Sequence, residues 1–88
     1  MKNFVLAISA ILLLTSSHAA AEITAGLIMD VQEGLAMRGY PVLLSGVLDP
    51  ATREALRQFQ VNNGIHPPTG LIDESTLRYL QIDPELAQ

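Results

Sequence analysis

Apolar and polar positions follow a helical period in the segment Ala25–Arg38. Its apolar residues recur three or four positions apart and form one stripe, which predicts an amphipathic helix. Gly34 lies inside this helix and would let a second helix approach closely, while Gly39 and Pro41 mark the helix end. The stripe consists of Leu27, Ile28, Val31, Leu35 and, as a further candidate, Met37.

Two later segments carry the start signals of further helices. Asp49 precedes a proline, and an aspartate N-cap followed by proline at the first helical position favours a helix, here Pro50 to about Asn62. Asp73 caps a third predicted helix, Glu74–Gln81. The inward-facing positions of the middle helix are Ala55, Leu56 and Phe59.

The start signals belong to a phrase that the chain contains twice. "GVLDPATREAL" begins at Gly46 and "GLIDESTLRYL" begins at Gly70, 24 residues later. Each copy gives a loop glycine, two aliphatic residues expected to pack into the core, a capping Asp and a Thr in the first helical turn, whose hydroxyl is expected to bond nearby backbone or the facing loop. The pairs are Val47–Leu48 and Leu71–Ile72, and the threonines are Thr52 and Thr76. We therefore predict an all-α protein, a compact three-helix bundle with two loop–helix quasi-repeats.

The first 21 residues have the three-part layout of a secretory signal peptide. Lys2 gives a positive start, the apolar run Phe4–Leu14 is interrupted only by Ser9, and small, mostly polar residues then lead to "AAA". We predict cleavage after Ala21, with Ala19 as the second choice, and an uncleaved anchoring helix as the alternative. The apolar run is short for a membrane span, which needs about 20 residues.

These features predict three regions and an exported product. Residues 1–21 are the signal peptide, 22–82 the three-helix domain and 83–88 a short C-terminal tail. After cleavage the protein is expected in the periplasm or outside the cell. Within 22–88, four arginines face nine acidic residues, a net charge of −5, which disfavours nucleic acid and anionic membrane surfaces as partners.

Candidate catalytic and metal-ligating residues are few. After cleavage one histidine remains, His66, and the chain has no cysteine, so we expect no metal and no cofactor. Ser45 or Ser75 beside His66 would be needed for a nucleophilic triad, and no nucleophile elbow is present. Asp73 and its neighbour Glu74 are better explained as helix-start residues than as a pair of catalytic acids. We therefore predict that the protein is not an enzyme.

One set of polar residues is a candidate binding surface. These residues lie where the first helix ends and along the second helix, and the side chains include forked guanidinium groups and amides that bind carboxylates, peptide amides and sugars. An ordinary solvated face is the alternative. The set consists of Arg38, Tyr40, Arg53, Arg57, Gln60, Asn62 and Asn63.

The doubled phrase resembles the peptidoglycan-binding domain that accompanies many cell-wall hydrolases and transpeptidases. The resemblance is carried by "VQEGLAMRGY", "SGVLDPATREALRQFQVNNGI" and "TGLIDESTLRYL", in this order. It implies a small three-helix fold without activity of its own, located at the bacterial wall, with the stem peptide and neighbouring glycan as ligand. A cell-wall enzyme or another envelope protein is a further candidate partner.

Two other interpretations follow from the same resemblance. The family's module usually accompanies an enzyme, so a chain with this module alone is alternatively a periplasmic protein–protein interaction subunit that does not bind the wall. The segment "LRQFQVNNGIHPPTGLIDESTL" is also similar to the pro-domains of matrix metalloproteases. Those pro-domains act through a cysteine, which this chain lacks, so that mechanism is excluded.

Overall fold

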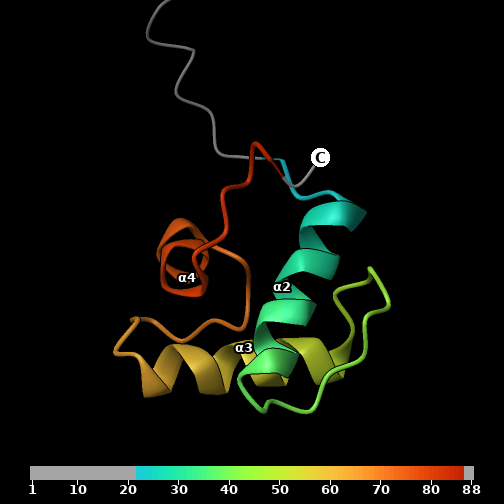
Figure 1. The fold of residues 1–88 in the computed structure, drawn as a ribbon. Coiled ribbons are helices and arrows are strands. Elements are labelled where there is room, and N and C mark those ends of the chain that lie inside the picture. The colour runs from blue at the N-terminus through green and yellow to red at the C-terminus, as the bar shows by residue number, and fades with distance from the viewer. Residues whose placement is uncertain (1–21, 87–88) are drawn as a thin grey trace, which may run out of the picture.

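The computed structural model describes residues 22–86, and within them the chain forms three α-helices and no strand. The helices are α2 (Ala25–Met37), α3 (Pro50–Asn62) and α4 (Glu74–Leu80). Figure 1 shows α3 lying across one end of α2, with α4 beside α2 and seen almost end-on. The predicted all-α three-helix class is confirmed. The predicted signal peptide lies outside the described residues.

The capping residues start the helices as the sequence indicated. The Asp49 carboxylate accepts a hydrogen bond from the backbone N–H of Thr52 (2.9 Å), and Asp73 accepts one from the N–H of Thr76 (2.8 Å). Thr24 caps α2 in the same way, which the sequence analysis did not predict. Each cap satisfies a backbone donor that the first turn of a helix leaves without a partner.

Two helices end one residue earlier than predicted. The helix α2 stops at Met37 rather than Arg38, and Gly39 then turns the chain with a φ of +92°. The helix α4 stops at Leu80 because Gln81, predicted as its last residue, adopts a left-handed conformation with a φ of +62°. A left-handed residue after the last turn is a common way to end a helix.

The core forms where α2 packs against both α3 and α4. Met37 is 79% exposed, so its place in the apolar stripe was wrong. It lies two residues after the buried Leu35, about 200° further around the helix, which turns it to solvent. The buried apolar residues are Leu27, Val31, Leu35, Ala55, Leu56, Phe59, Ile65, Leu77 and Leu80.

Only one residue of each aliphatic pair contributes to the core. Leu48 and Ile72 are partly buried against the core cluster, whereas Val47 is 60% and Leu71 49% exposed. The expectation that both members pack inward was therefore wrong. Consecutive side chains of an extended segment point to opposite sides, so a two-residue approach to a helix buries one of them.

A buried glutamine on α2 holds the first loop in place. The Gln32 side chain is fully buried, and its amide nitrogen donates to the Ser45 hydroxyl (3.0 Å), the Val47 carbonyl (3.0 Å) and the Thr52 hydroxyl (2.9 Å). Its carbonyl oxygen accepts from the backbone N–H of Gly46 (2.9 Å). A buried amide costs stability unless it is hydrogen-bonded, and here both the nitrogen and the oxygen of the side chain have partners.

Gln60 on α3 does the same for the second loop. Its amide nitrogen donates to the Leu71 carbonyl (2.9 Å) and the Thr76 hydroxyl (3.0 Å), and its carbonyl oxygen accepts from the N–H of Gly70 (2.8 Å). The repeated phrase is thus a docking unit that binds a glutamine on the preceding helix. The threonine hydroxyls, expected to bond backbone or the facing loop, instead accept from these glutamines.

Candidate functional site

Three of the seven predicted site residues meet around one aromatic ring. The Asn62 amide donates to the Tyr40 hydroxyl (2.8 Å), and the Tyr40 ring stands edge-on to Phe59 with 5.9 Å between centroids. The Arg38 guanidinium lies 5.9 Å from the centroid of the same Phe59 ring. We call Arg38, Tyr40 and Asn62 the Tyr40 cluster. Phe59 itself is buried, and Tyr40 and Arg38 pack against its ring.

Two further predicted residues are used inside the fold. The Asn63 amide donates to the Phe59 carbonyl (2.8 Å) and so closes the C-terminal end of α3. Gln60 has no exposed surface, and its side-chain amide is hydrogen-bonded to the second loop. It lies four residues after Leu56, on the same face of the helix, and this spacing is the signal that could have indicated its burial.

The last two predicted residues, Arg53 and Arg57, lie on another side of α3. Asn62 comes nine residues after Arg53, which places it about 180° around the helix. Arg57 forms an exposed ion pair with Glu54 (2.6 Å between Nη2 and Oε2). Its hydrogen bonds lower the pKa of Glu54, and those of Glu54 raise the pKa of Arg57. The predicted polar face is therefore divided into two separate surfaces.

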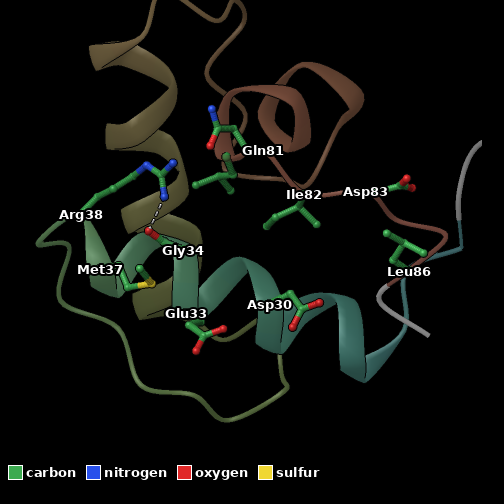
Figure 2. Close-up of a pocket in the computed structure, with 10 residues that line it drawn as sticks. Asp30, Glu33, Gly34, Met37, Arg38, Gln81, Ile82, Asp83 and Leu86 are labelled. Atoms are coloured by element: carbon green, nitrogen blue, oxygen red, sulfur yellow. Dashed lines mark hydrogen bonds between the residues drawn. The ribbon is translucent and has the colours of Figure 1, made fainter.

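A groove of about 440 Å³ lies between α2 and the chain that follows α4, and the sequence analysis did not predict it. Its floor is made by Gly34, Leu80 and Ile82. A Cβ at Gly34 would come within 3.3 Å of the Leu80 side chain, so this glycine does allow the predicted close approach. Figure 2 shows Ile82 pointing toward α2 across the groove.

The rim of the groove carries most of its charge. Asp30 and Glu33 come from one face of α2, and Asp83 comes from the chain after α4 (Figure 2). Arg38 stands at the opposite end from Asp83, with its Nη1 donating to the Gly34 carbonyl (2.9 Å). Arg38 therefore belongs both to the groove and to the Tyr40 cluster, and it joins the two into one surface.

The spacing of the α2 residues could have indicated this wall of the groove. Asp30, Glu33, Gly34 and Met37 are separated by three and four positions, which puts them on one side of a helix. The opposite wall could not be predicted in this way, since residues 83–88 were assigned to a tail. In the structure Ile82, the last residue of the predicted domain, packs against the core, and within the predicted tail the Leu86 N–H donates to the Asp83 carbonyl (3.0 Å).

A family model described as "Putative peptidoglycan binding domain" matches residues 24–80, more than half of the chain. The chain belongs to this peptidoglycan-binding domain family. None of the curated proteins and none of the solved structures compared with the chain matches it. The matched segment contains the three helices and the Tyr40 cluster, whereas the groove wall from Gln81 to Leu86 follows it.

The groups that the domain presents suit binding by charge, hydrogen bonding and apolar contact. Within residues 22–86, no three His, Cys, Asp or Glu side chains are grouped so that they could hold a metal ion. Across the same residues, no helix is long and apolar enough to cross a membrane. The Ser45 hydroxyl bonds to Asp49, Gln32 and the Val47 backbone, and the Ser75 hydroxyl accepts from Arg78.

Proposed function

We propose that this protein binds peptidoglycan in the bacterial cell envelope, with the groove and the Tyr40 cluster as its binding surface, and that it catalyses no reaction. The observation that carries the proposal is the family match over residues 24–80. The surface supports it, because Arg38 connects an acidic groove with an apolar floor to a half-buried tyrosine and an exposed asparagine. Stem peptides and sugars offer the complementary amines, carboxylates, methyl groups and hydroxyls.

The absence of catalysis is proposed from the uses of the candidate nucleophiles. The Ser45 hydroxyl bonds to Gln32 of α2 and to Asp49, the Ser75 hydroxyl bonds to Arg78, and no hydrogen bond within residues 22–86 joins either serine to His66. A serine nucleophile requires a base within hydrogen-bonding reach. The proposed role is therefore attachment to the wall rather than cleavage of it.

The proposed location follows from the ligand. A peptidoglycan-binding domain acts in the envelope or outside the cell, and the N-terminal segment has the layout of an export signal. We extend the proposal to export through cleavage after Ala21, with residence in the periplasm or secretion.

The test is sedimentation of the purified protein with purified sacculi. We expect the protein to pellet with the sacculi, and an Arg38→Gln variant to pellet less because it loses the charge shared by the groove and the Tyr40 cluster. Arg53→Gln is the matched control, since it also removes an exposed arginine, which lies on α3 on the side away from Asn62. Wild-type protein that stays wholly in the supernatant would refute wall binding. Equal losses for both variants would refute the proposed surface and leave the function standing.

Several exposed apolar side chains favour a second candidate function, that of an interaction subunit for another envelope protein. Met29 on α2 is 42% exposed, and in the first loop Leu43 is 80%, Leu44 49% and Val47 60% exposed. Exposed apolar patches mark interaction sites in many soluble proteins. This function predicts a stable complex with an envelope protein and no retention by sacculi. Replacement of Leu43 and Val47 by Ser would abolish that complex and leave sacculus binding unchanged.

A further inference from the structure

The Tyr40 hydroxyl has a hydrogen-bond partner for its oxygen but none for its proton. A phenolic O–H can both donate and accept, whereas the nitrogen of an asparagine side chain can only donate. The Asn62 Nδ2 lies 2.8 Å from the Tyr40 oxygen, so the oxygen accepts and the phenolic proton is directed away from the amide. Within residues 22–86, no other hydrogen bond involves this hydroxyl. The proton is therefore available to an acceptor outside the domain.

The fold holds both partners of this bond in place. The backbone N–H of Tyr40 donates to the Leu35 carbonyl (3.0 Å), and the Tyr40 ring packs edge-on against the buried Phe59. Asn62 is the last residue of α3, and the Asn63 side chain ties this helix end to the Phe59 carbonyl (2.8 Å). The amide and the phenol are thus set against each other before a ligand arrives, which lowers the cost of binding.

The same bond contributes little to the stability of the core. It joins residues 22 positions apart, at the ends of α2 and α3, and it is exposed to solvent. Water competes for an exposed hydrogen bond, so the net contribution of such a bond to folding is small. Its main physical effect is to fix the direction in which the phenolic proton points.

We propose that Asn62 is a positioning residue that turns the Tyr40 hydroxyl outward as a hydrogen-bond donor, and that this donor meets an acceptor oxygen of the ligand. The inference rests on the proposed function, because Tyr40 belongs to the surface proposed to bind the wall. Arg38 supports it, since its guanidinium lies against the same Phe59 ring and can only donate. Acceptor oxygens occur in both the peptide and the glycan of the wall, so the donor alone does not select between them.

Raman spectroscopy tests the direction of the bond without any ligand. In the Fermi doublet of tyrosine, the higher-frequency band is strong for a phenol that accepts and weak for a phenol that donates strongly. Tyr79→Phe leaves Tyr40 as the one tyrosine of the chain. We expect an accepting signature in this protein and a donating signature after Asn62→Asp, because an ionised carboxylate can only accept. A donating signature with Asn62 in place, or no change with Asn62→Asp, would overturn the proposal.

Retention by purified sacculi tests what the free proton does. Asn62→Ala leaves the phenol able to donate but no longer directs it, whereas Asn62→Asp takes up its proton. We expect retention to fall in the order wild type, Asn62→Ala, Asn62→Asp. The Asn62→Asp protein should bind about two- to tenfold more weakly than wild type, which is the range of one hydrogen bond, and about as weakly as Tyr40→Phe. An Asn62→Asp protein that binds as tightly as wild type would overturn the proposal.

A double-mutant cycle separates this role from the charge that aspartate adds. If Asn62 acts through the Tyr40 proton, Asn62→Asp causes no further loss in a protein that already carries Tyr40→Phe. An equal loss in both backgrounds would mean that the added charge itself weakens binding, and it would overturn the proposal. Urea unfolding of the four proteins of the cycle confirms that each is folded under the binding conditions.

Sacculi stripped of their stem peptides by an amidase distinguish the two sources of the acceptor. An Asn62→Asp loss that persists on stripped sacculi supports a glycan oxygen, and a loss confined to intact sacculi supports a peptide oxygen. Equal retention of wild type, Asn62→Asp and Tyr40→Phe would support wall binding and overturn this inference. Wild-type protein that stays in the supernatant would overturn the proposed function, while the Raman comparison would still decide the direction of the bond.

Discussion

Replacement of Gly70 by alanine should destabilise the fold more than the same replacement at Gly64. Both glycines have a positive φ, +75° at Gly70 and +70° at Gly64, so both substitutions carry the same backbone penalty. They differ in the space around the new methyl group. A Cβ at Gly70 would lie 2.8 Å from the Arg53 carbonyl oxygen, whereas at Gly64 nothing lies within 4 Å.

The two geometries lead to different expected losses in the free energy of unfolding. The left-handed conformation costs an alanine about 1 to 2 kcal/mol, which is the whole effect expected at Gly64. At Gly70 the obstacle is backbone, and overpacking of this kind adds about 1 to 3 kcal/mol. Relief of the clash would also move the Gly70 N–H away from the Gln60 carbonyl, which accepts its buried hydrogen bond. We therefore expect a total loss of about 2 to 5 kcal/mol for Gly70→Ala.

The assay is urea unfolding followed by circular dichroism at 222 nm, with the free energy of unfolding compared at equal slope. Thermal unfolding gives a second measure, because about 1 kcal/mol shifts Tm by about 4 to 8 °C in a domain of this size. Losses for the two variants that agree within about 0.5 kcal/mol would refute the reasoning. They would mean that the second loop does not dock against α3 as closely as described.

Three further predictions follow from the hydrogen bonds and the Tyr40 cluster. Gln60→Leu leaves the buried Gly70 N–H and other loop groups without a partner, so we expect a loss of about 2 to 4 kcal/mol in urea unfolding, and a loss below about 1 kcal/mol would contradict it. Hydrogen bonds from Thr52, and to a smaller extent from Ser45, lower the pKa of Asp49. The cap therefore stabilises the fold fully above the unfolded pKa of about 4, and this stabilisation is lost as the pH falls through the lower pKa of the folded state. The stability difference between wild type and Asp49→Ala should therefore shrink below pH ~4, and a difference independent of pH would count against the cap. Tyr40→Phe should change the free energy of unfolding by less than about 1 kcal/mol because its hydroxyl bond is exposed, yet reduce retention by sacculi; unchanged retention would remove Tyr40 from the binding surface.

The sequence by itself determined the helices and their starts. A cap such as Asp49 or Asp73 acts on an amide three residues away, and the apolar stripe of α2 has a period of one turn. Both signals are local, so they can be recognised in the sequence without knowledge of the rest of the fold. The glycines of the repeated phrase were likewise recognisable, because the same residue stood at the same place in both copies.

Only the tertiary structure decided which polar residues are internal and where the site lies. Gln60 has a polar side chain but lies on the buried face of α3, and its partners are 10 to 16 residues away in the second loop and the first turn of α4. The groove depends on the path of the chain after α4, where Ile82 packs against the core and Asp83 and Leu86 line the groove. Helical spacing can place Gln60 on the buried face and Asp30 and Glu33 on one side of α2, but the partners that meet them come from segments distant in sequence, which the local spacing does not specify.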